Sequence, residues 1–92
     1  MKNRPAEPTV SSAWMIDGVS FPQGTKFRSK YKGYVYYGKV NNGALEFKGK
    51  QFLSPSAAAF SITRNPISGW VFWDCKMPGH SSWTNIRKFK RR

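Results

Sequence analysis

The fold is organised around one stretch of sequence, Phe52-Leu53-Ser54-Pro55-Ser56-Ala57-Ala58-Ala59-Phe60. Ser54 suits the N-cap of a helix, because its hydroxyl can accept a hydrogen bond from a free amide of the first turn. Pro55 suits the first helical position, where a missing N–H costs nothing. The alanines favour a helix and add little bulk, so we predict a helix over residues 55–63 that approaches a sheet closely. Three larger side chains are expected to attach it to the sheet: Leu53, Phe60 and Ile62.

The start of this predicted helix also suggests an anion site. The N-terminus of a helix carries free amides and a partial positive charge, which together favour a phosphate. Ser54 and Ser56 would add hydroxyl groups at the same place. The structural alternative is a capped helix whose serines bond only to the protein itself.

Short strands separated by turn signals surround the helix. Asn41-Asn42-Gly43 is a strong hairpin signal, since Asn and Gly tolerate positive φ. Residues 25–31, 34–40 and 44–47 before the helix, and 70–75 after it, have strand-like patterns. Trp83 and Ile86 lie three apart and are expected to fold back onto the core. We predict an α+β domain, a small antiparallel sheet of about four to five short strands with one main helix packed across it.

The organisation along the chain follows from composition. Residues 1–12 contain little that could be buried, so we expect a disordered basic arm. Residues 13–87 are expected to form a single domain, and residues 88–92 a basic C-terminal tail. A chain of 92 residues has little room for both a core and a deep catalytic cleft.

The charge of the chain points to a polyanionic partner. There are 16 Lys and Arg against 4 Asp and Glu, a formal net charge of +12, and aromatic residues make up 16%. Such an excess favours a nucleic acid over an anionic membrane surface, and we expect no membrane partner. Aromatic side chains left outside the core could stack on bases.

The most informative strand alternates cations with other residues. Lys26, Arg28, Lys30 and Lys32 recur every second position, which places them on one face of a strand. A solvated face of an antiparallel sheet is common and is one interpretation of this pattern. Like charges repel along a strand, so a phosphate-binding role is the other interpretation, and the two stay open here. Other cations are predicted to extend the nucleic-acid-binding surface: Lys39, Lys48, Lys50 and Arg87.

The segment that follows the helix carries polar groups suited to a base edge. Arg64 can donate in a bidentate manner, Asn65 has an amide and Ser68 a hydroxyl. Trp70 could offer a flat surface on which a displaced or methylated base stacks. The alternative is that Trp70 belongs to the core and the segment is only a connection.

Patterns typical of catalysis or metal binding are missing from the sequence. Ser54 and Ser56 have no histidine placed in a motif with them, and His80 lies in a Pro-Gly turn. We therefore expect no enzyme activity, no cofactor and no metal site. The single cysteine, Cys75, cannot form an internal disulfide, so we expect a small buried hydrophobe in a reducing compartment. That compartment would be the cytoplasm, as a nucleoid-associated protein, or the nucleus in a eukaryote.

Two motifs carry a family resemblance, Ser54-Pro55-Ser56-Ala57-Ala58-Ala59 and Gly69-Trp70-Val71-Phe72-Trp73. Together they resemble the RAMA domain, the restriction enzyme adenine methylase associated domain. Shorter matches accompany them: Gly24-Thr25-Lys26-Phe27, Tyr37-Gly38-Lys39-Val40, Gly43-Ala44-Leu45, Gly49-Lys50, Ser82-Trp83 and Ile86-Arg87. The resemblance covers residues 18–87. A domain associated with GIY-YIG nucleases carries a run similar to the first motif.

The sequence departs from the family pattern in places. Ser68 stands where the family usually has asparagine, and Arg64-Asn65-Pro66 stands where a glycine usually ends the helix. The helix usual at the family's N-terminal edge is not evident. These departures bear on ligand specificity more than on the fold.

The resemblance implies a non-catalytic DNA-binding module. Such domains look like DNA-recognition units attached to restriction, methylation or deubiquitinase-like proteins, with modified adenine in duplex DNA as the implied ligand. Standing alone, the domain would be a small DNA-associated, defence or anti-defence protein, by analogy. Two alternatives remain open at this point: a module that binds RNA or single strands, and a protein-interaction module with an acidic partner.

Overall fold

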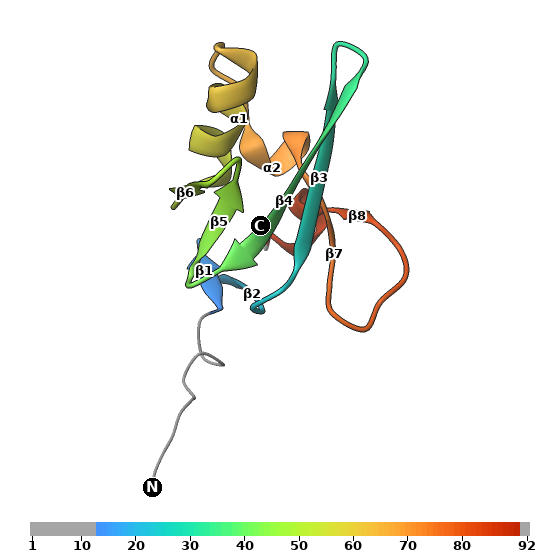
Figure 1. The fold of residues 1–92 in the computed structure, drawn as a ribbon. Helices are drawn as coiled ribbons and strands as arrows, with labels where there is room; N and C mark the ends of the chain where they lie inside the picture. The colour runs from blue at the N-terminus through green and yellow to red at the C-terminus, as the bar shows by residue number, and fades with distance from the viewer. Residues whose placement is uncertain (1–12, 91–92) are drawn as a thin grey trace, which may run out of the picture.

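The structure, a computed structural model, describes residues 13–90. The basic arm predicted for residues 1–12 lies outside the described residues, as do residues 91–92. The described chain forms strands, two α-helices and a 3₁₀-helix around one core, and Figure 1 shows their arrangement.

A six-stranded antiparallel sheet is the main element, with strand order β6-β5-β4-β3-β7-β8. Its strands are β3 (Lys26–Tyr31), β4 (Tyr34–Asn41), β5 (Ala44–Phe47), β6 (Lys50–Phe52), β7 (Asp74–Lys76) and β8 (Thr84–Asn85). A separate hairpin is formed by β1 (Trp14–Ile16) and β2 (Val19–Phe21). The α+β class and the antiparallel pairing are confirmed. The predicted number of strands was too low, because short segments pair at both edges of the sheet and in the separate hairpin.

The predicted hairpin turn between β4 and β5 is confirmed. Asn42 and Gly43 adopt φ values of 55° and 78°, the left-handed pair that a two-residue hairpin with right-handed strand twist requires. The β3–β4 turn uses the same geometry at Lys32 and Gly33, with φ of 50° and 85°. Lys32 therefore lies in a turn, and its predicted place on the alternating strand was wrong.

The helix α1 (Pro55–Thr63) has the predicted bounds. The Ser54 hydroxyl accepts a hydrogen bond from the Ala57 amide at 3.0 Å, as expected of an N-cap. Ala58 and Ala59 are fully buried, so the small-sided face does pack closely. Two of the expected attachments were wrong: Leu53 is 74% exposed and Phe60 43% exposed, because the alanine face turns inward and the bulky face outward.

The segment predicted as a strand over residues 70–75 is instead a short helix followed by a strand. The helix α2 spans Gly69–Phe72, and β7 begins only at Asp74. A Cβ built on Gly69 would lie 2.1 Å from the Pro55 carbonyl carbon, so α2 crosses α1 in backbone contact. The apolar residues of this segment have no periodicity in the sequence that would distinguish a strand from a buried helical turn.

Aromatic side chains dominate the core. Trp14 and Phe21 of the β1–β2 hairpin pack against Phe27 of β3, with ring centroids between 5.3 and 5.7 Å apart. Phe27 in turn contacts Trp73 at 6.2 Å. The hairpin thus closes one end of the sheet and completes the core.

The chain returns to this core in the 3₁₀-helix η2 (Ile86–Phe89). Ile86 is fully buried, as predicted, and Phe89 makes an edge-to-face contact with Phe21 at 6.1 Å. Residues 88 and 89 of the predicted tail (88–92) thus take part in this 3₁₀-helix.

The close packing of α1 can be tested with two alanines of the same helix. We expect Ala58→Leu to lower the free energy of unfolding by about 1–3 kcal/mol, because the buried site has no room for the larger side chain. Ala57 is exposed, so Ala57→Leu should change the free energy of unfolding by at most about 0.5 kcal/mol. Urea denaturation of both variants measures the difference, and equal stabilities would contradict the packing described here.

Candidate nucleic-acid interface

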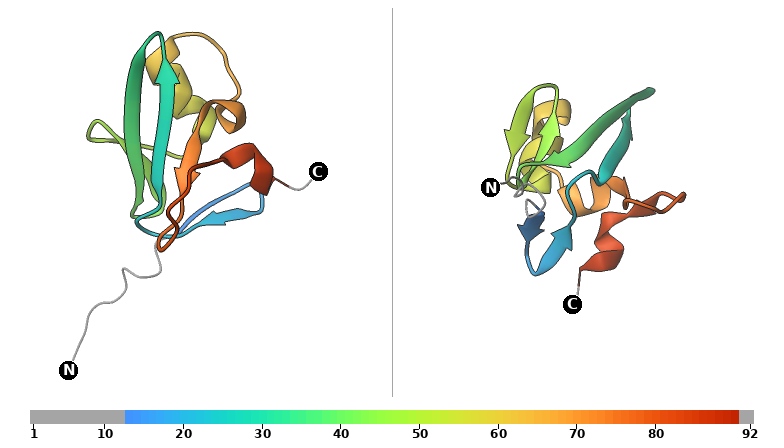
Figure 2. Two further views of the ribbon diagram at one scale, coloured as in Figure 1. Left: turned by 90° about the vertical axis from the view of Figure 1, so that its right-hand side faces the viewer. Right: turned by 60° about the horizontal axis from the view of Figure 1, so that its bottom comes forward.

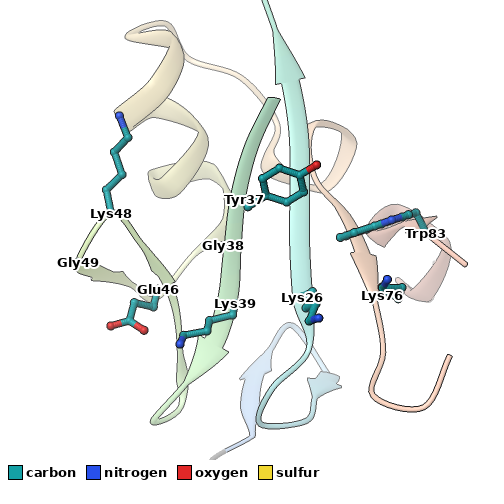
Figure 3. Close-up of a pocket in the computed structure, with 9 residues that line it drawn as sticks. All are labelled: Lys26, Tyr37, Gly38, Lys39, Glu46, Lys48, Gly49, Lys76 and Trp83. Carbon is teal, nitrogen blue, oxygen red and sulfur yellow. The ribbon is translucent and has the colours of Figure 1, made fainter. Parts of the chain in front are cut away.

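The two faces of β3 differ as the sequence alternation predicted. Phe27 and Ser29 are buried against the core, whereas Lys26, Arg28 and Lys30 point to the opposite side. We call that opposite side the outer face of the sheet. Figure 3 views the sheet from this outer face.

The register of the sheet brings further cations beside those of β3. Lys26 pairs directly with Lys39 of β4 and with Lys76 of β7, so three lysines form a row across the sheet. In the next row, Arg28 lies between Tyr37 and Asp74. We call the basic face the set Lys26, Arg28, Lys30, Lys39 and Lys76. Lys76 was not among the predicted site residues.

The cations of the basic face outnumber the carboxylates beside them, which are Glu46, paired with Lys39, and Asp74, paired with Arg28. Among residues 13–90, the one salt bridge within 4.0 Å joins Lys90 to Asp17, at 3.9 Å, away from the basic face. Directly opposed like charges destabilise a sheet. The row of lysines therefore lowers the stability of the folded protein, and a bound polyanion would reduce this repulsion.

Trp83 is an aromatic residue of this site that sequence reasoning missed. It was expected to fold onto the core, but it lies half-buried on the outer face, just before β8. The Arg28 guanidinium carbon lies 4.3 Å from the Trp83 ring centroid, and the Lys76 ammonium 5.1 Å from it. Such cation–π contacts fix the ring in place on the basic face. The pairing of β7 with β8 puts it there, and no short-range pattern reveals that pairing.

A hollow of about 590 Å³ opens on the outer face, bordered by the basic face and Trp83. Its lining residues are Lys26, Tyr37, Gly38, Lys39, Glu46, Lys48, Gly49, Lys76 and Trp83, as Figure 3 shows. Tyr37 is 63% exposed, and its ring is seen nearly face-on in that view, while Trp83 is seen edge-on. The hollow therefore combines a flat aromatic surface with a cationic border.

Two residues at the border of the hollow are partly engaged elsewhere. The Lys48 ammonium lies 5.9 Å from the Tyr36 ring, and in Figure 3 it points away from Tyr37. The Glu46 carboxylate accepts a hydrogen bond from the Asn41 side-chain amide at 3.3 Å. Lys48 therefore lies at the edge of the predicted surface and not within it.

Other predicted residues lie away from the basic face. Lys50 pairs with the buried Phe47, so its side chain leaves β6 on the side opposite to the basic face. Arg87 borders a second hollow, whose lining residues Val71, Asn85, Arg87 and Lys88 are distinct from those of the first. Lys32 lies in the turn at the far end of the β3–β4 hairpin, which extends beyond β5 and β7 in Figures 1 and 2.

The two serines at the start of α1 make hydrogen bonds within the protein. Ser54 caps the helix, and the Ser56 hydroxyl accepts a hydrogen bond from the Gly69 amide at 2.9 Å. The structural alternative raised for this helix start therefore accounts for both hydroxyls. A phosphate contact at this place stays a prediction.

The segment between α1 and α2 leaves the predicted polar residues Arg64, Asn65 and Ser68 exposed, and a base contact by them stays a prediction. Arg64 is the left-handed C-cap of α1, and the Asn65 side chain donates to the Thr63 carbonyl at 3.2 Å. Ser68 takes the N-cap position of α2 without a side-chain hydrogen bond to that helix. Trp70 is only 7% exposed, with the Lys90 ammonium 4.9 Å from its ring. Trp70 is part of the core and has no free surface for stacking.

Cys75 has the properties of a core residue. It is buried, and burial, assisted by the neighbouring Asp74 charge, raises the pKa of its thiol to about 11. The thiol is therefore protonated at neutral pH and a poor nucleophile. Within residues 13–90 there is no group of three or more His, Cys, Asp and Glu side chains that could hold a metal ion. The same residues contain no helix long and apolar enough to cross a membrane.

Comparisons of the chain with protein-family models, with curated proteins and with solved structures gave no match. The site must therefore be interpreted from its own chemistry.

The contrast between the two tryptophans is testable. Trp70→Ala should lower the free energy of unfolding by about 3–5 kcal/mol, because it empties part of the core. Trp83→Ala removes a half-buried ring held mainly by cations and should cost about 1–2 kcal/mol. Thermal and urea denaturation of both variants provide the comparison. A larger loss for Trp83→Ala than for Trp70→Ala would contradict these placements.

Proposed function

We propose that this protein is a non-catalytic nucleic-acid-binding module whose basic face binds the phosphate backbone. The observation that carries the proposal is the row of Lys39, Lys26 and Lys76, directly paired across three strands. Glu46 faces Lys39 at one end of this row, but among residues 13–90 no salt bridge within 4.0 Å joins the row to a carboxylate. Phosphates placed along this row would replace lysine–lysine repulsion with charge-assisted hydrogen bonds.

The size of the row fits a nucleic-acid strand. Adjacent strands of a sheet are about 4.8 Å apart, so the row spans roughly 10 Å. Consecutive phosphates of one strand rise by roughly 3.4 Å along the helix axis but lie roughly twice as far apart along the backbone, so the row can meet about two phosphates. Arg28 and Lys30 extend the same face toward the far end of the β3–β4 hairpin. The planar Arg28 guanidinium, stacked on Trp83, is suited to bidentate contact with phosphate.

DNA is the ligand implied by the RAMA resemblance, with modified adenine as its distinguishing feature. The geometry favours the hollow beside Tyr37 as the place where a base is met, since Trp70 is covered and Asn65 is bonded within its own loop. A base that reaches this hollow from a duplex has to leave the helical stack.

The salt dependence of binding tests the proposal directly. If the basic face neutralises about five phosphates, log Kd should rise with log salt concentration with a slope of about 4.5. Lys26→Gln combined with Lys39→Gln should weaken binding to all sequences alike and reduce that slope by about 2. The same variant should be within about 1 kcal/mol of the unaltered protein in stability, because it removes both the lysine–lysine repulsion and the Lys39–Glu46 pair.

A charge-matched variant provides the control. Lys50→Gln combined with Lys88→Gln removes the same charge from positions outside the basic face. We expect affinity and slope close to those of the unaltered protein. Equal losses in the two double variants would show that only net charge matters, and the basic face would not be the interface.

The modified-base part of the proposal has its own test. A duplex with methylated adenine should bind about 10-fold more tightly than the unmethylated duplex of the same sequence, the scale on which a pocket distinguishes one methyl group. Fluorescence anisotropy at physiological salt, with several sequences, measures the ratio. Equal affinities for the two duplexes would contradict recognition of the modified base. Binding to nucleic acid, whether methylated or not, would then remain.

A further inference from the structure

We propose that Tyr37 is a stacking platform for an unpaired nucleobase, so that the preferred ligand is a strand with at least one base outside a duplex stack. The inference rests on the proposed nucleic-acid function and specifies the ligand of the same face. It begins from an aromatic ring that the core does not use: Tyr37 is 63% exposed on the outer face, beside Arg28 in the sheet register.

Tyr37 presents a face of its ring to the outer side of the sheet. In Figure 3 its ring is seen nearly face-on from the outer side, and the 63% exposure of Tyr37 leaves ring surface free for an approaching molecule. The hydroxyl lies at the ring edge and leaves that face free. A nucleobase can stack on such a face without sequence-specific contacts, because every base has a π-face of its own.

Trp83 provides a wall beside this platform. Its ring centroid lies 6.5 Å from that of Tyr37, with an angle of 54° between the ring planes. The rings are too close and too tilted to hold a base between them. A base would therefore lie on the open face of Tyr37 with its edge toward Trp83. The contacts of Trp83 with Arg28 and Lys76 hold this wall in position without a ligand.

The hollow has the size and charge for one nucleotide. Its volume of about 590 Å³ lies within the usual range for small-molecule sites, roughly 300–1,000 Å³. Lys39 lies two residues beyond Tyr37 on the same face of β4, about 6.6 Å along the strand. A nucleotide whose base stacks on Tyr37 would thus have its phosphate beside Lys39 and Lys26. A paired base inside a duplex cannot present its face to this ring.

The experiment compares three probes of one sequence: a single strand, a fully paired duplex, and a duplex with one unpaired central base. We expect the two probes with unpaired bases to bind more tightly than the duplex. Tyr37→Ala should weaken their binding by about 5- to 100-fold, the scale of one stacked base. It should change duplex binding by less than about 3-fold. Tyr37→Phe keeps the ring and should restore binding.

A second exposed tyrosine is the matched control. Tyr34, at the far end of the β3–β4 hairpin, is 69% exposed and does not line the hollow. Tyr34→Ala should leave all affinities within about 2-fold. A fluorescent adenine analogue at the unpaired position should be quenched on binding to the unaltered protein and not to Tyr37→Ala. Parallel DNA and RNA probes show which backbone is preferred.

The outcomes separate the two proposals. If Tyr37→Ala binds all three probes as the unaltered protein does, the stacking platform is wrong. If the Lys26→Gln, Lys39→Gln variant still weakens binding in that case, the basic face remains a phosphate-binding surface. If no probe binds at low salt, both proposals fail together.

Discussion

The structure depends on a backbone crossing between the first turn of α1 and the first residue of α2. Gly69 has no side chain, and any Cβ would overlap the Pro55 carbonyl group. Two hydrogen bonds hold the crossing: the Gly69 amide donates to the Ser56 hydroxyl, and the Trp73 indole N–H donates to the Pro55 carbonyl at 3.1 Å. The second bond satisfies a polar group in a fully buried tryptophan, which would otherwise be costly.

This crossing also determines what the outer face contains. Trp73 in the core fixes where β7 begins, and β7 then pairs with β3 in the register that sets Lys76 beside Lys26. β8 pairs with β7 in turn and delivers Trp83 to the same surface. The helices on the inner side and the cations on the outer side are thus connected through one tryptophan. A substitution of Gly69 would therefore affect the outer face indirectly, by displacing β7.

Local chemistry was sufficient to predict α1, its serine cap, the Asn42–Gly43 turn and the alternation along β3. Each depends on residues within one turn or one strand. Other features depend on partners distant in sequence. Phe72 and Trp73 are apolar in any conformation, so a run of them does not distinguish a helix from a strand. The place of Trp83 follows from a pairing of two very short strands, which no local pattern specifies. Leu53 and Phe60 are exposed because the helix buries its small residues instead.

The buried thiol of Cys75 can serve as a chemical probe of local opening in the sheet. It lies on β7, opposite Phe27, and its high pKa and burial keep it from reagents while the strand is paired. Alkylation then requires a local opening that exposes Cys75, and an opening that separates β7 from β3 would also carry Lys76 away from Lys26. The rate of labelling therefore reports the frequency of that opening. The chain contains a natural probe, in its single cysteine, for the integrity of the surface on the other side of the sheet.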